Sequence, residues 1–502
     1  MQIKTIVCLL ILTAASIVSG QVSVDAFDKY IESARGDWKV PGMAVTVVKD
    51  GKVLLAKGYG VRELGKNDAV NADTLFGAMS TTKAMTAVTM AMLVDEGKIS
   101  WDDKVVKYLP EFRVADPYIT AEIRIRDLFT HNAGMGNADF LWTWTPDLSA
   151  PEILDRMQHA RPAYPFRGGY TYQNIMYAAA GEVIRKVSGM PWERFVTERL
   201  FVPLGMTNTF ATYGASKAYQ NRSSAHGQID EKPAAIPEQT ADPIAAAGSV
   251  WSTANDIAKW VGFMLGDGTA NGKVLVKPAS MQLILSPQAI VPPAQFYPTV
   301  RLTKPHWTTY GMGWFQHDYR GEMINYHTGS LAGRTAIIAI IPEKKTGIYV
   351  FGNMSEELRH ALVYKALDMF AFSDANGRDW SKEIKTLYDG IAEQGRRQTE
   401  ASRARRAANT KPSLGIEKYA GRYSDPLYGE DEVTHSDGKL QLKIGKGART
   451  ADLEHWHYDT FQTAWHQRWL GRGFVSFQLN PVTGEIQTLT VGGAQLRRMV
   501  GQ

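Results

Sequence analysis

The chain has 502 residues, of which 44% are hydrophobic and 21% are charged, and its formal net charge is +5. This ordinary composition excludes a disordered or fibrous protein, and the length favours more than one domain. A net charge this small gives no argument for binding nucleic acid.

The first 20 residues have the pattern of a secretory signal peptide. Lys4 precedes an apolar run at residues 6 to 17, which is too short to span a bilayer, and two small residues follow it. We expect cleavage before Gln21 and a periplasmic or secreted protein without a stable membrane anchor. Cys8 is the only cysteine, so the sequence predicts a mature protein without disulfides.

The next elements predict an antiparallel sheet. An amphipathic helix is expected at residues 24 to 35, and extended runs follow at residues 43 to 48 and 53 to 57. Asp50 and Gly51 lie between the two runs, which favours a hairpin turn. Because the strands precede a buried helix, the order indicates a sheet with a helix packed on one face.

That buried helix carries the first candidate chemistry. Residues 80 to 96 are apolar nearly all round, which is typical of a helix inside a core. Ser80 stands at its expected start, and Lys83 follows on the same face. The free N–H groups at a helix start favour developing negative charge, and burial lowers the pKa of a lysine by up to about 3 to 5 units. The pair predicts a nucleophile beside a base; the alternative is that Ser80 only caps the helix.

Ser436 and Lys439 have the same spacing as Ser80 and Lys83. They flank Asp437 and Gly438, which favour a solvent-exposed hairpin turn between two alternating runs. A lysine there would stay protonated, so the spacing alone is a weak signal.

Two further motifs follow in a fixed order. Tyr172-x-Asn174 comes after a glycine-rich turn and before an apolar helix, and His327-x-Gly329 ends a short extended run. A second Tyr-x-Asn, which begins at Tyr219, lacks the glycine turn. Together with the Ser80 helix, this set resembles the serine beta-lactamase and penicillin-binding-protein superfamily. The resemblance is closest to its branch with His-x-Gly in place of Lys-Thr-Gly, which holds class C-like hydrolases, D-aminopeptidases, DD-carboxypeptidases and esterases.

The resemblance covers residues 25 to 370 and implies a catalytic set. Its members are Ser80, Lys83, Tyr172, Asn174, His327 and Ser330. The serine would attack a carbonyl and form an acyl-enzyme, and Tyr172 would carry the proton to the leaving group. Whether Lys83 or a Tyr172 phenolate, favoured by a charged Lys83, is the base stays open.

The remaining roles also come from the resemblance. Asn174 would bind the substrate amide and steady Lys83, and His327 would link to Tyr172 with only partial charge. The backbone N–H groups of Ser80 and Ser330 would form the oxyanion hole. Gly329 has no side chain, so a substrate backbone could lie against its strand.

Between residues 101 and 290 the pattern is mostly helical. Trp142, Trp144 and Trp307 lie in aromatic loops, where they either pack or wall a substrate cleft. The sheet is expected to resume with strands at residues 335 to 341 and 347 to 351, and a helix at residues 357 to 372 closes the domain.

The C-terminal part changes character. Residues 376 to 411 are rich in charge and predict a solvated helical linker. Residues 412 to 502 show short alternating segments, which predict an all-beta module that loosely resembles a lipocalin-like barrel. His455 and His457 share a face, but no third ligand is evident, so no metal and no other cofactor are expected.

The whole chain therefore predicts an α/β protein of the α+β type. We expect a signal peptide (1–20), a catalytic domain with an antiparallel sheet and a helical subdomain (21–375), the linker (376–411) and the barrel (412–502). The expected function is a secreted serine hydrolase that cleaves amide or ester bonds of small acyl or D-amino-acid-containing substrates. A class C-like beta-lactamase and a catalytically idle penicillin-binding sensor are the alternatives. The expected partner is a small-molecule or peptide substrate, and a homo-oligomer stays open.

Overall fold

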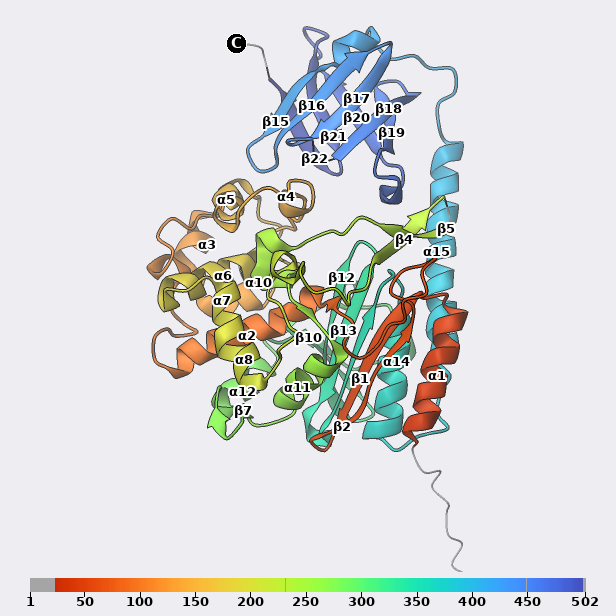
Figure 1. The fold of residues 1–502 in the computed structure, drawn as a ribbon. Coiled ribbons are helices and arrows are strands. Elements are labelled where there is room, and N and C mark those ends of the chain that lie inside the picture. The colour runs from red at the N-terminus through yellow and green to blue at the C-terminus, as the bar shows by residue number, and fades with distance from the viewer. Residues whose placement is uncertain (1–22, 231, 448, 500–502) are drawn as a thin grey trace, which may run out of the picture.

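The computed structural model describes residues 23–230, 232–447 and 449–499. The predicted signal peptide lies outside these residues. A mixed α/β body with a large antiparallel sheet is followed by a separate barrel, as Figure 1 shows. The predicted fold class is confirmed.

The main sheet has eight antiparallel strands. Its order is β2 (Lys52–Gly60), β1 (Gly42–Lys49), β14 (Thr346–Gly352), β13 (Arg334–Ile341), β12 (Glu322–Leu331), β11 (Phe315–Tyr319), β10 (Thr308–Tyr310) and β9 (Ala289–Ile290). Asp50 and Gly51 have φ values of 49° and 74° in the turn between β1 and β2. Both lie in the left-handed region that a two-residue hairpin of this kind requires.

Alternate residues of the central strands face two different cores. Val45 and Val47 of β1 pack with α1 (Val24–Asp37) and α14 (Leu358–Ala366), whereas Ala44 and Val48 pack on the other side. The second core contains α2 (Thr82–Asp95), α6 (Ile175–Ser188) and α11 (Ala254–Met264). This two-sided burial explains why β1, β13 and β14 are almost continuously apolar.

The helical subdomain lies beside the sheet (Figure 1), and residues of its helices α4 (Phe140–Thr143) and α10 (Ala245–Gly248) line the candidate site. Its remaining helices are α3 (Pro117–Glu122), α5 (Ala150–Arg156), α7 (Trp192–Val196), α8 (Val202–Leu204), α9 (Tyr213–Ser216) and α12 (Pro278–Ile284). The short helix α13 (Val300–Thr303) packs instead on the core that contains α1 and α14. Three short pairs add β3 (Phe76–Gly77) with β6 (Trp251–Ser252), β4 (Ala225–Ile229) with β5 (Lys232–Ile236), and β7 (Thr269–Ala270) with β8 (Lys273–Val274).

The C-terminal module is a closed eight-stranded barrel. Its strands are β15 (Gly421–Asp425), β16 (Gly429–Ser436), β17 (Lys439–Ile444), β18 (Arg449–His457), β19 (Thr460–Trp465), β20 (Phe474–Leu479), β21 (Ile486–Val491) and β22 (Ala494–Arg498). Each strand pairs with the next, and β15 pairs with β22. Apolar side chains such as Phe461 and Leu489 fill the interior.

The connecting helix α15 (Trp380–Ala404) differs from a solvated linker at its start. Trp380 and Ile384 are completely buried, and the Ser381 hydroxyl accepts a 3.0 Å hydrogen bond from the Trp38 indole of the segment that follows α1. Only the later turns of α15 are mainly exposed. The helix is therefore anchored in the α/β body before it reaches the barrel. Its first turn carries apolar residues, which the charged composition of the whole segment does not indicate.

The barrel rests on α4, as Figure 1 shows. Trp144, just after α4, packs edge-on against Trp465 of β19, with 5.3 Å between ring centroids. The Arg449 guanidinium donates a 2.8 Å hydrogen bond to the Thr143 carbonyl. The barrel thus holds the end of a helix whose Trp142 and Thr143 line the candidate site.

Candidate active site

Ser80 lies in a tight turn that leads directly into α2. Residues Met79–Thr81 form a 3-10 turn, and Met79 has a φ of 46°, which is an unfavourable backbone conformation for a residue with a side chain. Such strain is commonly found at functional sites. The side chains from Thr82 to Leu93 are all buried, as the apolar sequence predicts.

Lys83 is completely buried beneath Ser80. Its Nζ donates to Ser80 Oγ at 3.2 Å, to Asn174 Oδ1 at 2.6 Å and to the Ala247 carbonyl at 2.9 Å. The ring of Tyr172 lies 4.9 Å from the same nitrogen. Burial lowers the pKa of Lys83 from 10.5 to about 7, against a smaller opposing effect of the Asp139 carboxylate. A large fraction of Lys83 is therefore neutral at neutral pH and can accept the Ser80 proton.

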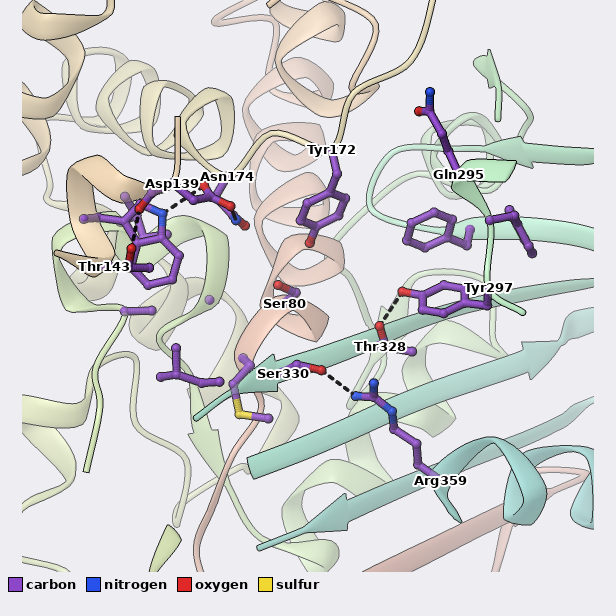
Figure 2. Close-up of a pocket in the computed structure, with 18 of the residues that line it drawn as sticks. Ser80, Asp139, Thr143, Tyr172, Asn174, Gln295, Tyr297, Thr328, Ser330 and Arg359 are labelled. Atoms are coloured by element: carbon purple, nitrogen blue, oxygen red, sulfur yellow. Dashed lines mark hydrogen bonds between the residues drawn. The ribbon is translucent and has the colours of Figure 1, made fainter. Parts of the chain in front are cut away.

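Tyr172 lies above Ser80, and its hydroxyl points toward the serine (Figure 2). The hydroxyl is buried, and no described residue forms a hydrogen bond of ordinary geometry with it. Burial raises the pKa of Tyr172 well above 10. The phenolate considered from the sequence is thereby disfavoured, and of the two candidates Lys83 is the better base.

Asn174 connects Lys83 to a carboxylate that the sequence motifs did not include. Its Oδ1 accepts from Lys83, and its Nδ2 donates to Asp139 Oδ2 at 2.8 Å. Asp139 also accepts from the Trp142 indole at 2.9 Å and from the Asn137 amide at 3.0 Å. Asp139 belongs to no motif, and only its place just before the aromatic run at 140 to 144 could have drawn attention to it.

His327 has a different partner from the one expected. Its Nδ1 donates to the Thr328 carbonyl at 2.6 Å, so Nε2 is the acceptor for the Tyr310 hydroxyl at 2.9 Å. Burial lowers the pKa of His327 to about 3. The link to Tyr172 predicted from the resemblance is replaced by one to Tyr310, and the ring is neutral.

Gly329 and Ser330 of β12 lie beside the Ser80 turn. A Cβ at Gly329 would stand 2.4 Å from the Ala78 carbonyl oxygen and 3.1 Å from the Ser80 nitrogen. The glycine thus permits the approach of β12 to this turn, and the expected contact with a substrate backbone stays a prediction. Arg359 of α14, which no sequence motif indicated, donates to the Gly329 carbonyl at 2.5 Å and to Ser330 Oγ at 2.9 Å.

A cavity of about 550 Å³ surrounds Ser80, and its lining includes Asp139, Tyr172, Asn174, Ser330 and Arg359. Trp142 lines it as expected, but Trp144 and Trp307 do not. Trp144 faces the barrel, because the chain turns away from the cavity at the end of α4. Trp307 lies at the surface with 37% of its area exposed. The walls of the cavity are mainly aromatic and apolar, and Figure 2 shows how they surround the serine.

The other sequence candidates lie elsewhere. Ser436 is exposed at the end of β16, and the Tyr219 hydroxyl donates to the Asp73 carbonyl outside the cavity. Within the described part of the chain, no group of three or more His, Cys, Asp or Glu residues could hold a metal ion. Over the same residues, no helix is long and apolar enough to cross a membrane.

The fold and the site together define a protein of the beta-lactamase type. Residues 27–368 match the family described as Beta-lactamase, and residues 405–500 match a family described as Domain of unknown function (DUF3471). Because the first match covers more than half of the chain, the protein belongs to the beta-lactamase family. The DUF3471 region forms the eight-stranded barrel.

Its relatives include hydrolases and penicillin-binding proteins. The chain is 28% identical over 454 residues to the unguisins hydrolase ungD of Aspergillus violaceofuscus, covering 82% of this chain and 77% of the relative. It is 26% identical over 313 residues to penicillin-binding protein 4 of Amycolatopsis lactamdurans, covering 62% and 80%.

Two solved structures share the fold over nearly the whole chain. The octameric penicillin-binding protein homologue from Pyrococcus abyssi has a TM-score of 0.60 at 22% identity, with 94% of this chain and 99% of that chain covered. SurE, determined in complex with D-Leu, has a TM-score of 0.53 at 19% identity, covering 95% and 99%.

Proposed function

We propose that this protein is a serine hydrolase that forms an acyl-enzyme on Ser80. The observation that carries the proposal is the 3.2 Å contact between Ser80 Oγ and a buried Lys83 whose pKa is lowered to about 7. The neutral amine accepts the hydroxyl proton as Ser80 attacks a carbonyl carbon. A general base works best when its pKa lies near the working pH, and Lys83 meets that condition.

Tyr172 and the backbone complete the reaction cycle. In its neutral form Tyr172 donates a proton to the departing amine or alcohol and recovers one from Lys83. The N–H groups of Ser80 and Ser330 face the developing oxyanion, where loss of one donor typically costs about 100- to 1000-fold in rate. Water then releases the acyl group by the same steps in reverse.

We propose amides and esters of small acyl or D-amino-acid groups as substrates. Support comes from the relatives, one of which is named a hydrolase of unguisins, and from the fold shared with a protein determined with D-Leu. The aromatic walls of the cavity suit an apolar side chain of such a group. We propose that the protein belongs to the His-x-Gly branch of the superfamily, which the motif at His327 and the neutral state of its ring support.

A class C-like beta-lactamase is the second candidate, and an idle penicillin-binding sensor is the third. A neutral His327 gives no fixed charge for a beta-lactam carboxylate, and Arg359 is paired with Glu357 at 3.0 Å. Ester turnover should therefore exceed beta-lactam turnover. Rapid nitrocefin hydrolysis without ester hydrolysis would reverse this order.

The proposed setting of the enzyme is periplasmic or extracellular, supported by the pattern of residues 1 to 20. A homo-oligomer is also proposed, supported by the octameric homologue. Size-exclusion chromatography with light scattering tests the second point.

The decisive experiment is labelling with a fluorophosphonate, combined with a panel of D-aminoacyl amides, D-Ala-D-Ala peptides, nitrocefin and short esters. Ser80→Ala should abolish labelling and turnover while the fold is retained, because the Ser80 side chain caps no helix and its bond with Lys83 is worth only about 1 kcal/mol. Acylation by the wild type should accelerate with pH through an apparent pKa of about 7, because protonated Lys83 accepts no proton. Labelling that persists in Ser80→Ala would place the nucleophile elsewhere.

A further inference from the structure

We propose that Asp139 binds the ammonium group of the substrate, so that the enzyme acts on aminoacyl compounds with a free amino group. This inference rests on the proposed function and specifies its substrate class. It makes the enzyme an aminopeptidase or aminoacyl esterase that recognises the free amino end of its substrate. Asp139 would be a specificity residue rather than part of the proton-transfer machinery.

The placement of Asp139 carries the first step. Asp139 and Asn174 lie on one side of Ser80, and Thr328 and Arg359 lie on the other, as Figure 2 shows. A carbonyl under attack by Ser80 has two substituents, so the acyl part and the leaving group extend to opposite sides. The resemblance assigns Asn174 to the substrate amide, and we therefore place the acyl part on the side of Asn174 and Asp139. Asp139 accepts from Asn174 at 2.8 Å and is therefore within reach of the acyl group's α-amino group.

The charge around the cavity carries the second step. Among the described residues that line it, Asp139 is the only carboxylic acid and Arg359 the only Lys, Arg or His. Arg359 is paired with Glu357, whereas Asp139 accepts only from the neutral groups of Asn174, Trp142 and Asn137. A carboxylate has about four acceptor positions, so three donors leave one for a ligand. When Lys83 is neutral, the uncompensated charge beside the serine is therefore negative and favours a cation.

The arrangement also couples binding to catalysis. The Asp139 carboxylate raises the pKa of Lys83 in opposition to burial. An ammonium group bound to Asp139 offsets that carboxylate and shifts Lys83 toward its neutral, proton-accepting form. A substrate with a free amino group should thus be acylated at lower pH than its acetylated analogue.

The test compares D-alanine p-nitroanilide with N-acetyl-D-alanine p-nitroanilide. The ratio of their kcat/KM values should favour the free amine in the wild type and fall about 10- to 100-fold in Asp139→Asn, as expected for loss of a charge-assisted hydrogen bond. Asp139→Glu, which keeps the charge, should retain part of the preference. Asp147→Asn is the matched control, because Asp147 follows α4 whereas Asp139 precedes it and Asp147 lies outside the cavity, so this variant should leave the ratio unchanged.

A purely structural role of Asp139, through its bonds to Asn174 and Trp142, would lower both rates together. An unchanged ratio in Asp139→Asn, a wild-type preference for the acetylated compound, or identical pH profiles for both compounds would overturn the inference. If the wild type hydrolyses neither anilide, the readout becomes protection of Ser80 from the fluorophosphonate. Protection by D-alanine amide but not by its acetylated form supports the role of Asp139, and equal or no protection overturns it. Absence of Ser80-dependent labelling refutes the proposed function itself, so the two failures are distinguishable.

Discussion

Replacing Lys83 by methionine should change how the stability of the protein depends on pH. Burial lowers the pKa of Lys83 from 10.5 to about 7 in the folded protein. Each pKa unit corresponds to about 1.4 kcal/mol, so burial of this lysine lowers the free energy of unfolding by about 5 kcal/mol below pH 7. Methionine removes that cost but leaves acceptors on Asn174 and Ala247 without their donor, each at about 1 to 3 kcal/mol.

The pH dependence of the free energy of unfolding separates the titration of Lys83 from the effect of the lost hydrogen bonds. Between pH 7 and 10.5 the unfolded chain binds a proton on Lys83 that the folded chain does not bind, so the free energy of unfolding rises with pH. From pH 7 to pH 9 the wild type should gain about 2 kcal/mol relative to Lys83→Met. Other titrating groups contribute equally to both proteins and cancel in the difference.

The assay is urea unfolding of both proteins at the two pH values, followed by tryptophan fluorescence and circular dichroism. Lys98→Met is the matched control, because Lys98 follows the same helix and 51% of its side chain is exposed. The difference in free energy of unfolding between Lys98→Met and the wild type should be nearly the same at pH 7 and pH 9. If the difference in free energy of unfolding between the wild type and Lys83→Met stays constant from pH 7 to pH 9, Lys83 is charged in the folded protein. The assignment of Lys83 as the base would then be refuted.

Two further perturbations test the geometry around Ser80. Gly329→Ala should lower the acylation rate by more than about 100-fold and destabilise the protein by about 1 to 3 kcal/mol, because the new Cβ would collide with the Ala78 carbonyl. In the control Gly262→Ala the new Cβ meets no atom within 4 Å, so that variant should be nearly neutral. Equal acylation rates of the two variants in stopped-flow measurements would contradict this expectation. Removal of residues 412 to 502 should preserve labelling by a small fluorophosphonate but raise KM for peptides about tenfold. The reason is that α4 loses its contacts with the barrel, and these contacts are worth about 1 to 2 kcal/mol. An unchanged substrate profile would show that the barrel has no influence on the cavity.

The parts of the fold that the sequence predicts are those with local causes. The hairpin at Asp50 and Gly51 depends on two adjacent residues, and the buried helix after Ser80 depends on one continuous apolar segment. Both signals are complete within about fifteen residues. The rest of the sheet and the helical subdomain are predicted from the family resemblance, which depends on the order of the motifs around Ser80.

The parts that sequence reasoning misses depend on contacts between distant segments. Trp144 meets Trp465 from the barrel, and an aromatic loop gives no sign of which unit will cover it. The Tyr310 hydroxyl reaches His327 only because β10, β11 and β12 are neighbours in the sheet. Arg359 likewise contacts Gly329 from another element. In each case a polar or aromatic group finds a partner that only the tertiary fold determines.

The buried lysine explains why the nucleophile directly precedes a helix that is buried on nearly every side. A lysine near the surface would keep a pKa near 10 and would be almost entirely charged at pH 7. Bringing that pKa to about 7 requires removal of water from the amine, and the cost must be offset by packing elsewhere. The side chains of α2 from Thr82 to Leu93 are buried on every face, which provides this packing and places the lysine at the end nearest the cavity. Variants that loosen α2 without touching Ser80 or Lys83 should therefore lose activity at neutral pH before they lose the fold, because water reaching Lys83 restores its charge.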